Sequence, residues 1–460
     1  MEETKAKKYE IDMCQGPILK KMLLFAIPLM CSSILQLLFN AADIVVVGRF
    51  AGDNALAAVG ANGSVINLMV NLFVGMSVGA NVLAAHCYGA RQEQELSETV
   101  HTAMSLSLIS GVILTLAGVF GARQILIWMN TPDELLDLAA LYLRIYFGGI
   151  TATMIYNFGS ALLRAVGDTR RPLYYLLAAG VINVVLNLYF VICLQMDVAG
   201  VGIATVISQC VSAFLVVRCL MKEQGGIQLH LKELRIYPSK LVRILKVGLP
   251  AGLQGTIFSL SNVVIQSSVN TFGATVVAGA SASANIENFI YVAMNSFYQS
   301  TISFTSQNMG AGEYKRTRIV LRNGLLCVVV TALALGGITI LFGKQLLGIY
   351  STSGPVIEAG MQRLKIFACF YAFCGMMDVM VGAMRGLGQS ILPMIVSLLG
   401  ACGLRLLWVG TVFQMEQFHT IQGLYIAYPI SWLITFLAHV GCYFMVRHHL
   451  EKKLGISFKS

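Results

Sequence analysis

Polar side chains recur along one face of an early apolar segment. Gln36, Asn40 and Asp43 stand at positions i, i+4 and i+7, the spacing that places residues on one side of a helix. Asp43 is the only one of the three that ionises. An ionisable side chain within an apolar segment is costly to bury and is, by default, a candidate functional group.

Two later apolar segments add groups that could meet Asp43. Asn183 and Asn187 are spaced i, i+4, and Thr205 lies in the next segment. At about 1.5 Å per residue, Asp43, Thr205 and Asn187 lie about 9, 12 and 15 Å from the same ends of their segments. A carboxylate among amide and hydroxyl oxygens suits a proton or a small hard cation such as Na⁺. The alternative is that these groups only join helices by hydrogen bonds.

The second half of the chain has a different set of ionisable groups. At the positions that match Asp43 and its polar neighbours, the second half carries the apolar residues Ile265, Leu404, Trp408 and Ile426. Its isolated charges are instead Glu287, Asp378 and Arg405. Because an unpaired charge is expensive inside an apolar segment, we expect Arg405 to pair with one of the carboxylates. The alternative is that Glu287 or Asp378 binds a cationic substrate.

No motif indicates catalysis. The segment GMSVG at residues 75–79 has the spelling of a nucleophile elbow, but it lies in an apolar segment and not at a strand-to-helix turn. We interpret it as small-residue helix packing. The eleven cysteines include no CxxC pair, so neither a zinc site nor a disulfide framework is indicated. We therefore expect no enzyme and no cofactor.

The composition identifies the elements that must carry these residues. Of 460 residues, 57% are hydrophobic and 12% are charged, where soluble domains carry about 25% charge. Each membrane-spanning helix needs roughly 20 apolar residues. Segments of this kind predict an all-α integral membrane protein with twelve transmembrane helices, near residues 22–48, 54–88, 98–122, 135–163, 172–195, 199–221, 240–271, 275–308, 316–342, 357–384, 391–415 and 422–446.

Basic residues predict how these helices are oriented. Most of the 32 Lys and Arg residues fall in alternate loops and at the two ends of the chain, and such residues are retained on the cytoplasmic side. We therefore expect a multi-pass protein of the plasma (inner) membrane with both termini in the cytoplasm. The positive charge is a topology signal in contact with the lipid bilayer, so no nucleic-acid partner is predicted. We expect the chain to act as a monomer.

The two halves of the chain resemble each other. A shift of 221 or 222 positions aligns Pro28 with Pro250, and also the pairs Asn40 and Asn262, Arg164 and Arg385, and Pro172 and Pro393. Six helices per half predict two lobes related by a pseudo-two-fold axis along the membrane normal, an arrangement that recurs in secondary transporters. We expect lobes at residues 1–221 and 240–460, joined by a basic cytoplasmic linker at 222–239. Pro28 and Pro250 should bend their helices.

Several of these segments resemble the multidrug and toxic compound extrusion (MATE) family over essentially the whole chain. The resemblance is carried by NAADIVVVGRFAGDNALAAVG at 40–60, by CYGA at 87–90 and NMGAG at 308–312, and by the twin segments LRAVGD and MRGLGQ. It implies export of organic cations, drugs and other amphiphilic compounds in exchange for H⁺ or Na⁺ by rocking of two lobes.

The pattern is most similar to the DinF-like bacterial branch of that family. The resemblance implies a coupling site at Asp43, Asn183, Asn187 and Thr205, which would hold a proton or Na⁺. That branch often has a second aspartate where this chain has Asn187, which favours proton coupling here. The helix 7 glutamate of the NorM-like branch has no counterpart in this chain.

Two other functions remain open from the sequence. A flippase for lipid-linked precursors of the same superfamily would need more cationic charge to hold a phosphate, and the basic residues here are sparse. A passive channel would transport without an ion gradient.

Overall fold

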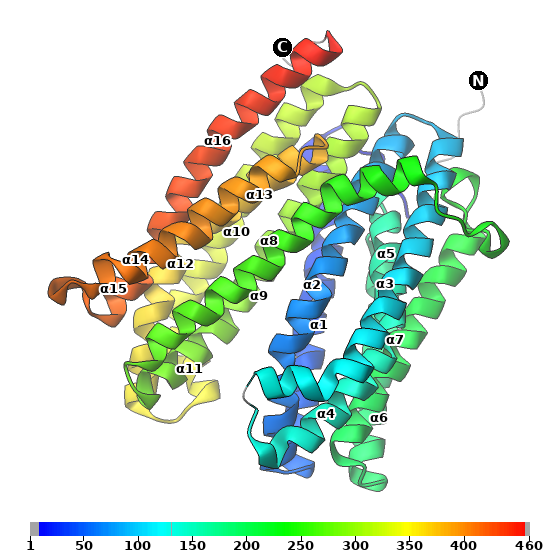
Figure 1. Ribbon diagram of the computed structural model, residues 1–460. Helices are drawn as coiled ribbons and strands as arrows, with labels where there is room; N and C mark the ends of the chain where they lie inside the picture. The colour runs from blue at the N-terminus through cyan, green and yellow to red at the C-terminus, as the bar shows by residue number, and fades with distance from the viewer. Residues whose placement is uncertain (1–8, 130, 456–460) are drawn as a thin grey trace. The chain divides into compact units, whose positions relative to one another are not determined.

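Helices make up almost all of the structure, a computed structural model that describes residues 9–129 and 131–455. In the first half they are α1 (Ile18–Phe50), α2 (Asp53–Gly89), α3 (Glu93–Trp128), α4 (Asp133–Gly148), α5 (Ile150–Ala165), α6 (Arg170–Leu188) and α7 (Asp197–Lys222) (Figure 1). A π-helical turn, η1 (Tyr189–Cys193), extends α6. Two short 3₁₀ turns, η2 (Gly225–Ile227) and η3 (Leu231–Glu233), follow α7.

The second half repeats this order with more interruptions. Its helices are α8 (Pro238–Asn270), α9 (Ala274–Gly310), α10 (Tyr314–Leu341), α11 (Gly343–Tyr350), α12 (Gly354–Gly386), α13 (Ile391–Ser397), α14 (Leu404–Gly410), α15 (Ile421–Tyr425) and α16 (Ala427–Leu454). The π-helical segment η4 (Leu398–Gly403) joins α13 to α14. The 3₁₀ turns η5 (Val412–Gln414) and η6 (Glu416–Phe418) precede α15.

The described helices account for the predicted membrane spans. Ten of them are long and apolar enough to cross a bilayer, and α4 with α5 forms an eleventh span that bends by 46°. The remaining long helix, α9, has 37 residues but is not among the helices that are apolar enough to count as candidate spans. Its polar side chains, among them Ser283, Glu287 and Ser300, are buried against its neighbours. The chain is therefore a multi-pass helical membrane protein, as the composition predicted.

Two compact units divide the described chain, and the division falls inside α1 and α8. One unit includes the residues up to Asp12 and then Cys31–Thr256; the other includes Met13–Met30 and the residues from Ile257 onward. Each of the two helices thus contributes its first part to one unit and its second part to the other. The division does not fall in the linker at 222–239, which belongs to the first unit.

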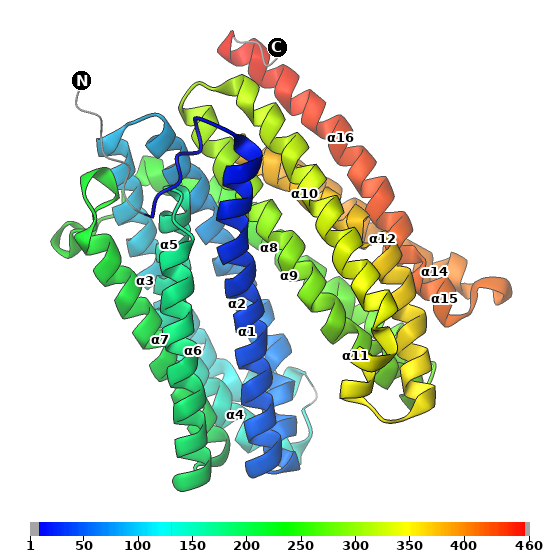
Figure 2. The ribbon, with the colours of Figure 1, turned by 180° about the vertical axis from the view of Figure 1, so that it is seen from behind.

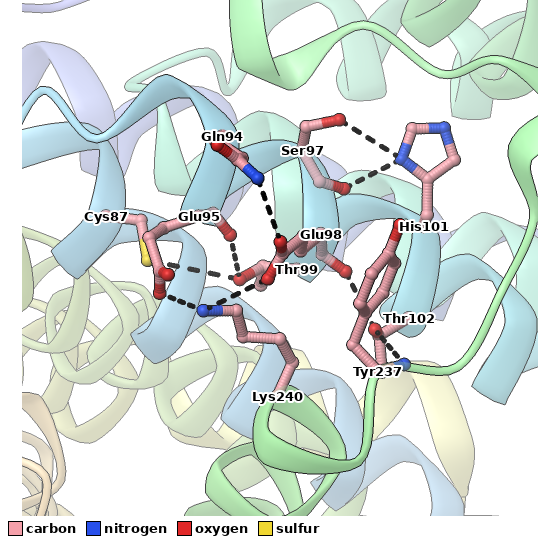
Figure 3. Close-up of polar contacts among 10 residues, drawn as sticks. All are labelled: Cys87, Gln94, Glu95, Ser97, Glu98, Thr99, His101, Thr102, Tyr237 and Lys240. Carbon is pink, nitrogen blue, oxygen red and sulfur yellow. Dashed lines mark hydrogen bonds and ion pairs between the residues drawn. The ribbon is translucent and has the colours of Figure 1, made fainter.

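The linker is held against the start of α3 (Figure 3). Lys240, at the beginning of α8, is 3% exposed and forms ion pairs with Glu95 and, at 3.5 Å, with Glu98. The backbone N–H of Tyr237 donates to Thr102 Oγ1 at 3.1 Å. Acidic residues in a first helical turn also complement the helix dipole, so α3 presents a negative end to a basic linker.

Glycines let α2 and the first part of α8 touch. A Cβ atom on Gly75 would lie 2.2 Å from the Cα atom of Gly252, and one on Gly79 would lie 2.1 Å from the carbonyl oxygen of Ile244. The segment 75–79 therefore brings two backbones together, the small-residue packing that the sequence predicted.

In the second unit, α9, α10, α12 and α16 run beside one another (Figure 2). Their side chains share one hydrophobic core. Its central residues include Val328, Phe367, Met384 and Trp432, all of which are buried. The guanidinium group of Arg363 lies against the ring of Phe367 in this core.

Candidate functional site

Four polar residues from three helices of the first unit form a chain of hydrogen bonds. The Nδ2 atom of Asn187 donates to the carboxylate of Asp43 and to Oδ1 of Asn183, the latter at 3.2 Å. Asn183 Nδ2 lies 3.4 Å from Thr205 Oγ1. The i, i+4 spacing on α6 puts both amides on one face, and α1 and α7 supply the other two groups. These are the four residues that the sequence predicted to meet.

Burial strengthens the electrostatic interactions of these hydrogen-bonded residues. Asn187 is fully buried and Asn183 is 5% exposed, while Asp43 is half-buried. Among the described residues, no Lys, Arg or His nitrogen lies within 4.0 Å of the Asp43 carboxylate. An ionised carboxylate without a basic partner at membrane depth attracts a proton or a cation.

One acceptor of the chain is unsatisfied. Asn187 Oδ1 is buried and has no hydrogen-bond partner, and such a group costs free energy until a donor or a cation reaches it. With the Asp43 carboxylate and the Thr205 hydroxyl, it gives the site oxygen ligands of the kind that a hard cation prefers. The donor set thus fits either a proton on Asp43 or a small cation.

A close helix contact positions Asp43. Gly180 on α6 faces the ring of Phe39 on α1, and a Cβ atom there would lie 1.8 Å from Phe39 Cε2. Phe39 is one turn before Asp43, and Gly180 is about one turn before Asn183. Only glycine at position 180 therefore lets α1 approach α6 closely enough for the carboxylate to reach the amides.

Tyr142 is a neighbour that the sequence did not reveal. It lies on α4, is 7% exposed, and packs with Val46, Val47 and Val201 around the site. It also interacts electrostatically with Asp43. No spacing or motif distinguishes Tyr142 from the 17 tyrosines of the chain, so only the folded arrangement identifies it.

Gln36 and Asn40 do not join this chain. Both are exposed, and neither forms a hydrogen bond with Asp43 among the described contacts. Helical spacing placed Gln36 and Asn40 on the same face of α1 as Asp43, but the amides of α6 reach only Asp43.

The pairing of charges in the second unit differs from the prediction. Glu287 on α9 accepts two hydrogen bonds from Arg363 on α12, each of 2.9 Å, and a third of 2.8 Å from Ser283. Glu287 therefore pairs with Arg363 and not with Arg405. The sequence analysis did not single out Arg363, because a basic residue near a helix end commonly extends toward the membrane surface.

The remaining charges of this unit stay apart. Arg405 Nε donates to Ser431 Oγ at 2.9 Å, and within the described chain no carboxylate lies within 4.0 Å of its guanidinium. Asp378 is half-buried on α12 and also forms no ion pair with the described residues. The expected pair between Arg405 and a carboxylate is absent from the described structure.

Both prolines lie inside long helices, Pro28 in α1 and Pro250 in α8. The units divide shortly after each proline, at Met30 and at Thr256. A bending role for the two residues remains a prediction.

The helices and the site define a class of protein. Repeated bundles of membrane helices, with carboxylates at membrane depth that have no ionic partner among the described residues, are the features of a secondary transporter rather than of an enzyme. The sequence profile of the MatE family matches residues 28–189 and 250–408, one match in each repeat. The chain therefore belongs to the MATE family of membrane transporters.

Curated relatives and solved structures agree with this assignment. The chain is 26% identical to the probable multidrug resistance protein YoeA of Bacillus subtilis (strain 168), over 92% of this chain and 93% of the relative. It is 28% identical to the probable multidrug resistance protein YpnP of the same organism, over 86% and 88%. A crystal structure of MATE in complex with MaL6 superposes with a TM-score of 0.90 at 22% identity, over 97% of this chain and 100% of that one. At that identity the superposition shows the fold alone.

Proposed function

We propose that this protein exports cationic or amphiphilic organic compounds, including drugs, in exchange for H⁺ or Na⁺. The observation that carries the proposal is the hydrogen-bonded chain from Asp43 through Asn187 and Asn183 to Thr205. The similarity to proteins named as probable multidrug resistance proteins supports the class of substrate.

Asp43 would act as the coupling group. Its carboxylate binds a proton or Na⁺, and the Asn187 amide is positioned to stabilise the ionised form by donation. A coupling ion drives transport only if it binds the inward-open and outward-open states unequally. Loading of Asp43 would therefore shift the balance between those states, and the rocking of the two lobes would release substrate outside.

The topology belongs to the same proposal. The distribution of basic residues favours both termini on the cytoplasmic side, so that substrate enters from the cytoplasm. We propose that the chain works in the plasma membrane as a monomer, because each chain contains its own complete Asp43 site.

Transport in proteoliposomes tests the proposal. The purified protein is reconstituted, and the uptake of a fluorescent organic cation is followed under an imposed pH or Na⁺ gradient. Asp43→Asn should abolish gradient-driven uptake, because the variant carries no titratable group at the site. Asp137→Asn is the matched control, since Asp137 is 83% exposed and pairs with Arg123 at 2.6 Å.

Separate gradients distinguish the two ions. Uptake driven by a pH gradient in Na⁺-free buffer assigns H⁺ as the coupling ion, and uptake that requires a Na⁺ gradient assigns Na⁺. Equal uptake in the absence of either gradient would mean a passive channel and would reject the antiport proposal.

A further inference from the structure

Arg405 is a buried cation without an ionic partner. It is 7% exposed, and its guanidinium carbon lies 4.3 Å from the ring centre of Tyr428 and 5.6 Å from that of Trp432. Nε donates to Ser431, which is 1% exposed. Neither Nη atom has an acceptor among the described residues. An arginine fork with both Nη groups unused is suited to a planar or tetrahedral anion.

The neighbouring carboxylate does not neutralise this charge. Glu287 is already satisfied by Arg363, whose guanidinium carbon lies 4.5 Å from the ring centre of Phe367 and 5.4 Å from that of Tyr425. The ring of Phe367 in turn lies tilted against that of Tyr428, at 4.8 Å between ring centres. One aromatic cluster therefore holds two guanidinium groups and one carboxylate, and it keeps a net positive charge.

Position within the membrane separates Arg405 from the lipid headgroups. The span Ile391–Gln414 places Arg405 nine residues from one end and fourteen from the other, which corresponds to about 14 Å and about 21 Å of helix. A cation at this depth is expensive unless it serves a function or has a partner. The aromatic faces offset part of the cost, but they supply no hydrogen-bond acceptor for the Nη groups.

Near matching positions of the internal repeat, the two halves of the chain carry charges of opposite sign. Arg405 directly follows Leu404, the residue at the repeat position of Asn183. The first unit thus has a carboxylate beside α6, whereas the second unit has a guanidinium on α14. The π-helical segment η4 ends at Gly403, immediately before α14, and π-helical insertions are frequent at functional sites.

We propose that Arg405 binds the anionic group of a small aromatic compound, a carboxylate, sulfonate or phosphate. Ser431 holds the guanidinium by its Nε atom, Tyr428 and Trp432 hold its faces, and the two Nη groups receive the anion. The second unit therefore extends the transported compounds to anionic and zwitterionic amphiphiles. The binding step is independent of ion coupling at Asp43, although its use in export rests on the proposed function.

Binding of ring-matched probes tests the proposal on the full-length protein in nanodiscs. The probes are 2-naphthoate, 2-naphthamide and 2-naphthylmethylammonium, which share a ring and differ in charge, and affinity is measured by isothermal titration. The wild type should bind 2-naphthoate at least tenfold more tightly than 2-naphthamide. Arg405→Gln should remove that preference, and Arg405→Lys should retain part of it because the charge remains without the fork.

Two controls separate this role from folding and from the first site. The double variant Glu287→Gln, Arg363→Gln removes the neighbouring ion pair without changing net charge and should keep the preference for 2-naphthoate. Asp43→Asn should keep it as well, even if it abolishes coupled transport. If Arg405→Gln does not fold, Arg405→Lys and the comparison of the three probes on the wild type still test the proposal.

The proposal is overturned if the wild type binds 2-naphthamide as tightly as 2-naphthoate. It is also overturned if folded Arg405→Gln retains the preference. Nanodiscs with and without phosphatidylglycerol distinguish the source of the anion. Unchanged affinity for 2-naphthoate supports a small-molecule site, whereas competition by the anionic lipid would assign Arg405 to a lipid headgroup and contradict the proposal.

Discussion

Asn187 is the residue that joins the two ends of the polar chain. Its amide nitrogen donates to both Asp43 and Asn183, while its buried oxygen has no partner. Spacing predicted that Asn183 and Asn187 share one face of a helix, and similar depths predicted that Asp43 could meet them. Neither predicted which atom donates, because that depends on how α1 and α6 are placed against each other.

Replacing this amide by a carboxylate should change the ion response. Asn187→Asp adds a second negative charge beside Asp43, and two carboxylates attract a hard cation more strongly than one. We expect severalfold stronger stimulation of transport by Na⁺ than in the wild type, measured as uptake into proteoliposomes over a range of Na⁺ concentrations. An unchanged Na⁺ response would argue against a cation site at Asn187. Asn157→Asp, on α5, is a control for the substitution itself.

Glu287 and Arg363 should contribute to stability as a pair. Their side chains are 5% and 12% exposed, and removal of one partner of a buried ion pair costs about 3–5 kcal/mol because the other charge is left uncompensated. Glu287→Gln should therefore lower the thermal unfolding temperature in detergent, and the double variant with Arg363→Gln should recover much of the loss. Additive losses in the double-mutant cycle would show that the two residues do not interact.

At the scale of elements, close contacts decide how helices meet. Hydropathy identifies α1 and α6 as spans, yet it carries no information about the distance between them. The absence of a side chain at Gly180 allows α1 and α6 to come close, because the ring of Phe39 occupies the space that a Cβ atom would fill. This role of Gly180 becomes visible only in the folded structure.

A side chain at position 180 should separate α1 from α6. Gly180→Ala places a methyl group against Phe39, and overpacking of this kind costs about 1–3 kcal/mol. We expect a lower unfolding temperature and slower coupled transport, both partly restored by the additional substitution Phe39→Ala. Gly337→Ala is the matched control, because open space surrounds a Cβ atom there. Full activity of Gly180→Ala would mean that the helix contact does not position Asp43.

Lys240 should protect the linker from proteolytic cleavage. Because it is buried between Glu95 and Glu98, Lys240→Met leaves both carboxylates without their shared partner. We expect faster tryptic cleavage at Lys232 and Arg235 in the variant, followed by gel electrophoresis of the reconstituted protein. Lys222→Met, at an exposed position, is the control and should be cleaved at Lys232 and Arg235 at the wild-type rate. Equal cleavage rates for the wild type and both variants would contradict the role of Lys240.

At the scale of the whole molecule, the apolar segments predicted the membrane spans but carried no information about where the two compact units divide. The expected helices overlap those that occur, because roughly 20 apolar residues in a row leave few alternatives. The ends of α3 and α16 lie several residues beyond the expected ones. The units divide inside α1 and α8, and hydropathy treats each of these as one continuous span. Sequence therefore favoured the polar linker as the boundary.

Other features depended on contacts far apart in the chain. The bend between α4 and α5 lies at Gly149, within a segment that reads as one apolar span. Arg363 reaches Glu287 across 76 positions. The sequence singled out Glu287, Asp378 and Arg405 as the isolated charges of the second half, but the partner of Glu287 follows from the packing of α9 against α12.

The central claim is that Asp43 couples ion movement to substrate movement. The most direct test imposes a substrate gradient alone on proteoliposomes and records H⁺ and Na⁺ movement with internal indicators. The wild type and Asp137→Asn should move one of these ions against the direction of substrate flow, and Asp43→Asn should move neither. Substrate-driven ion movement at the wild-type rate in folded Asp43→Asn would contradict the account.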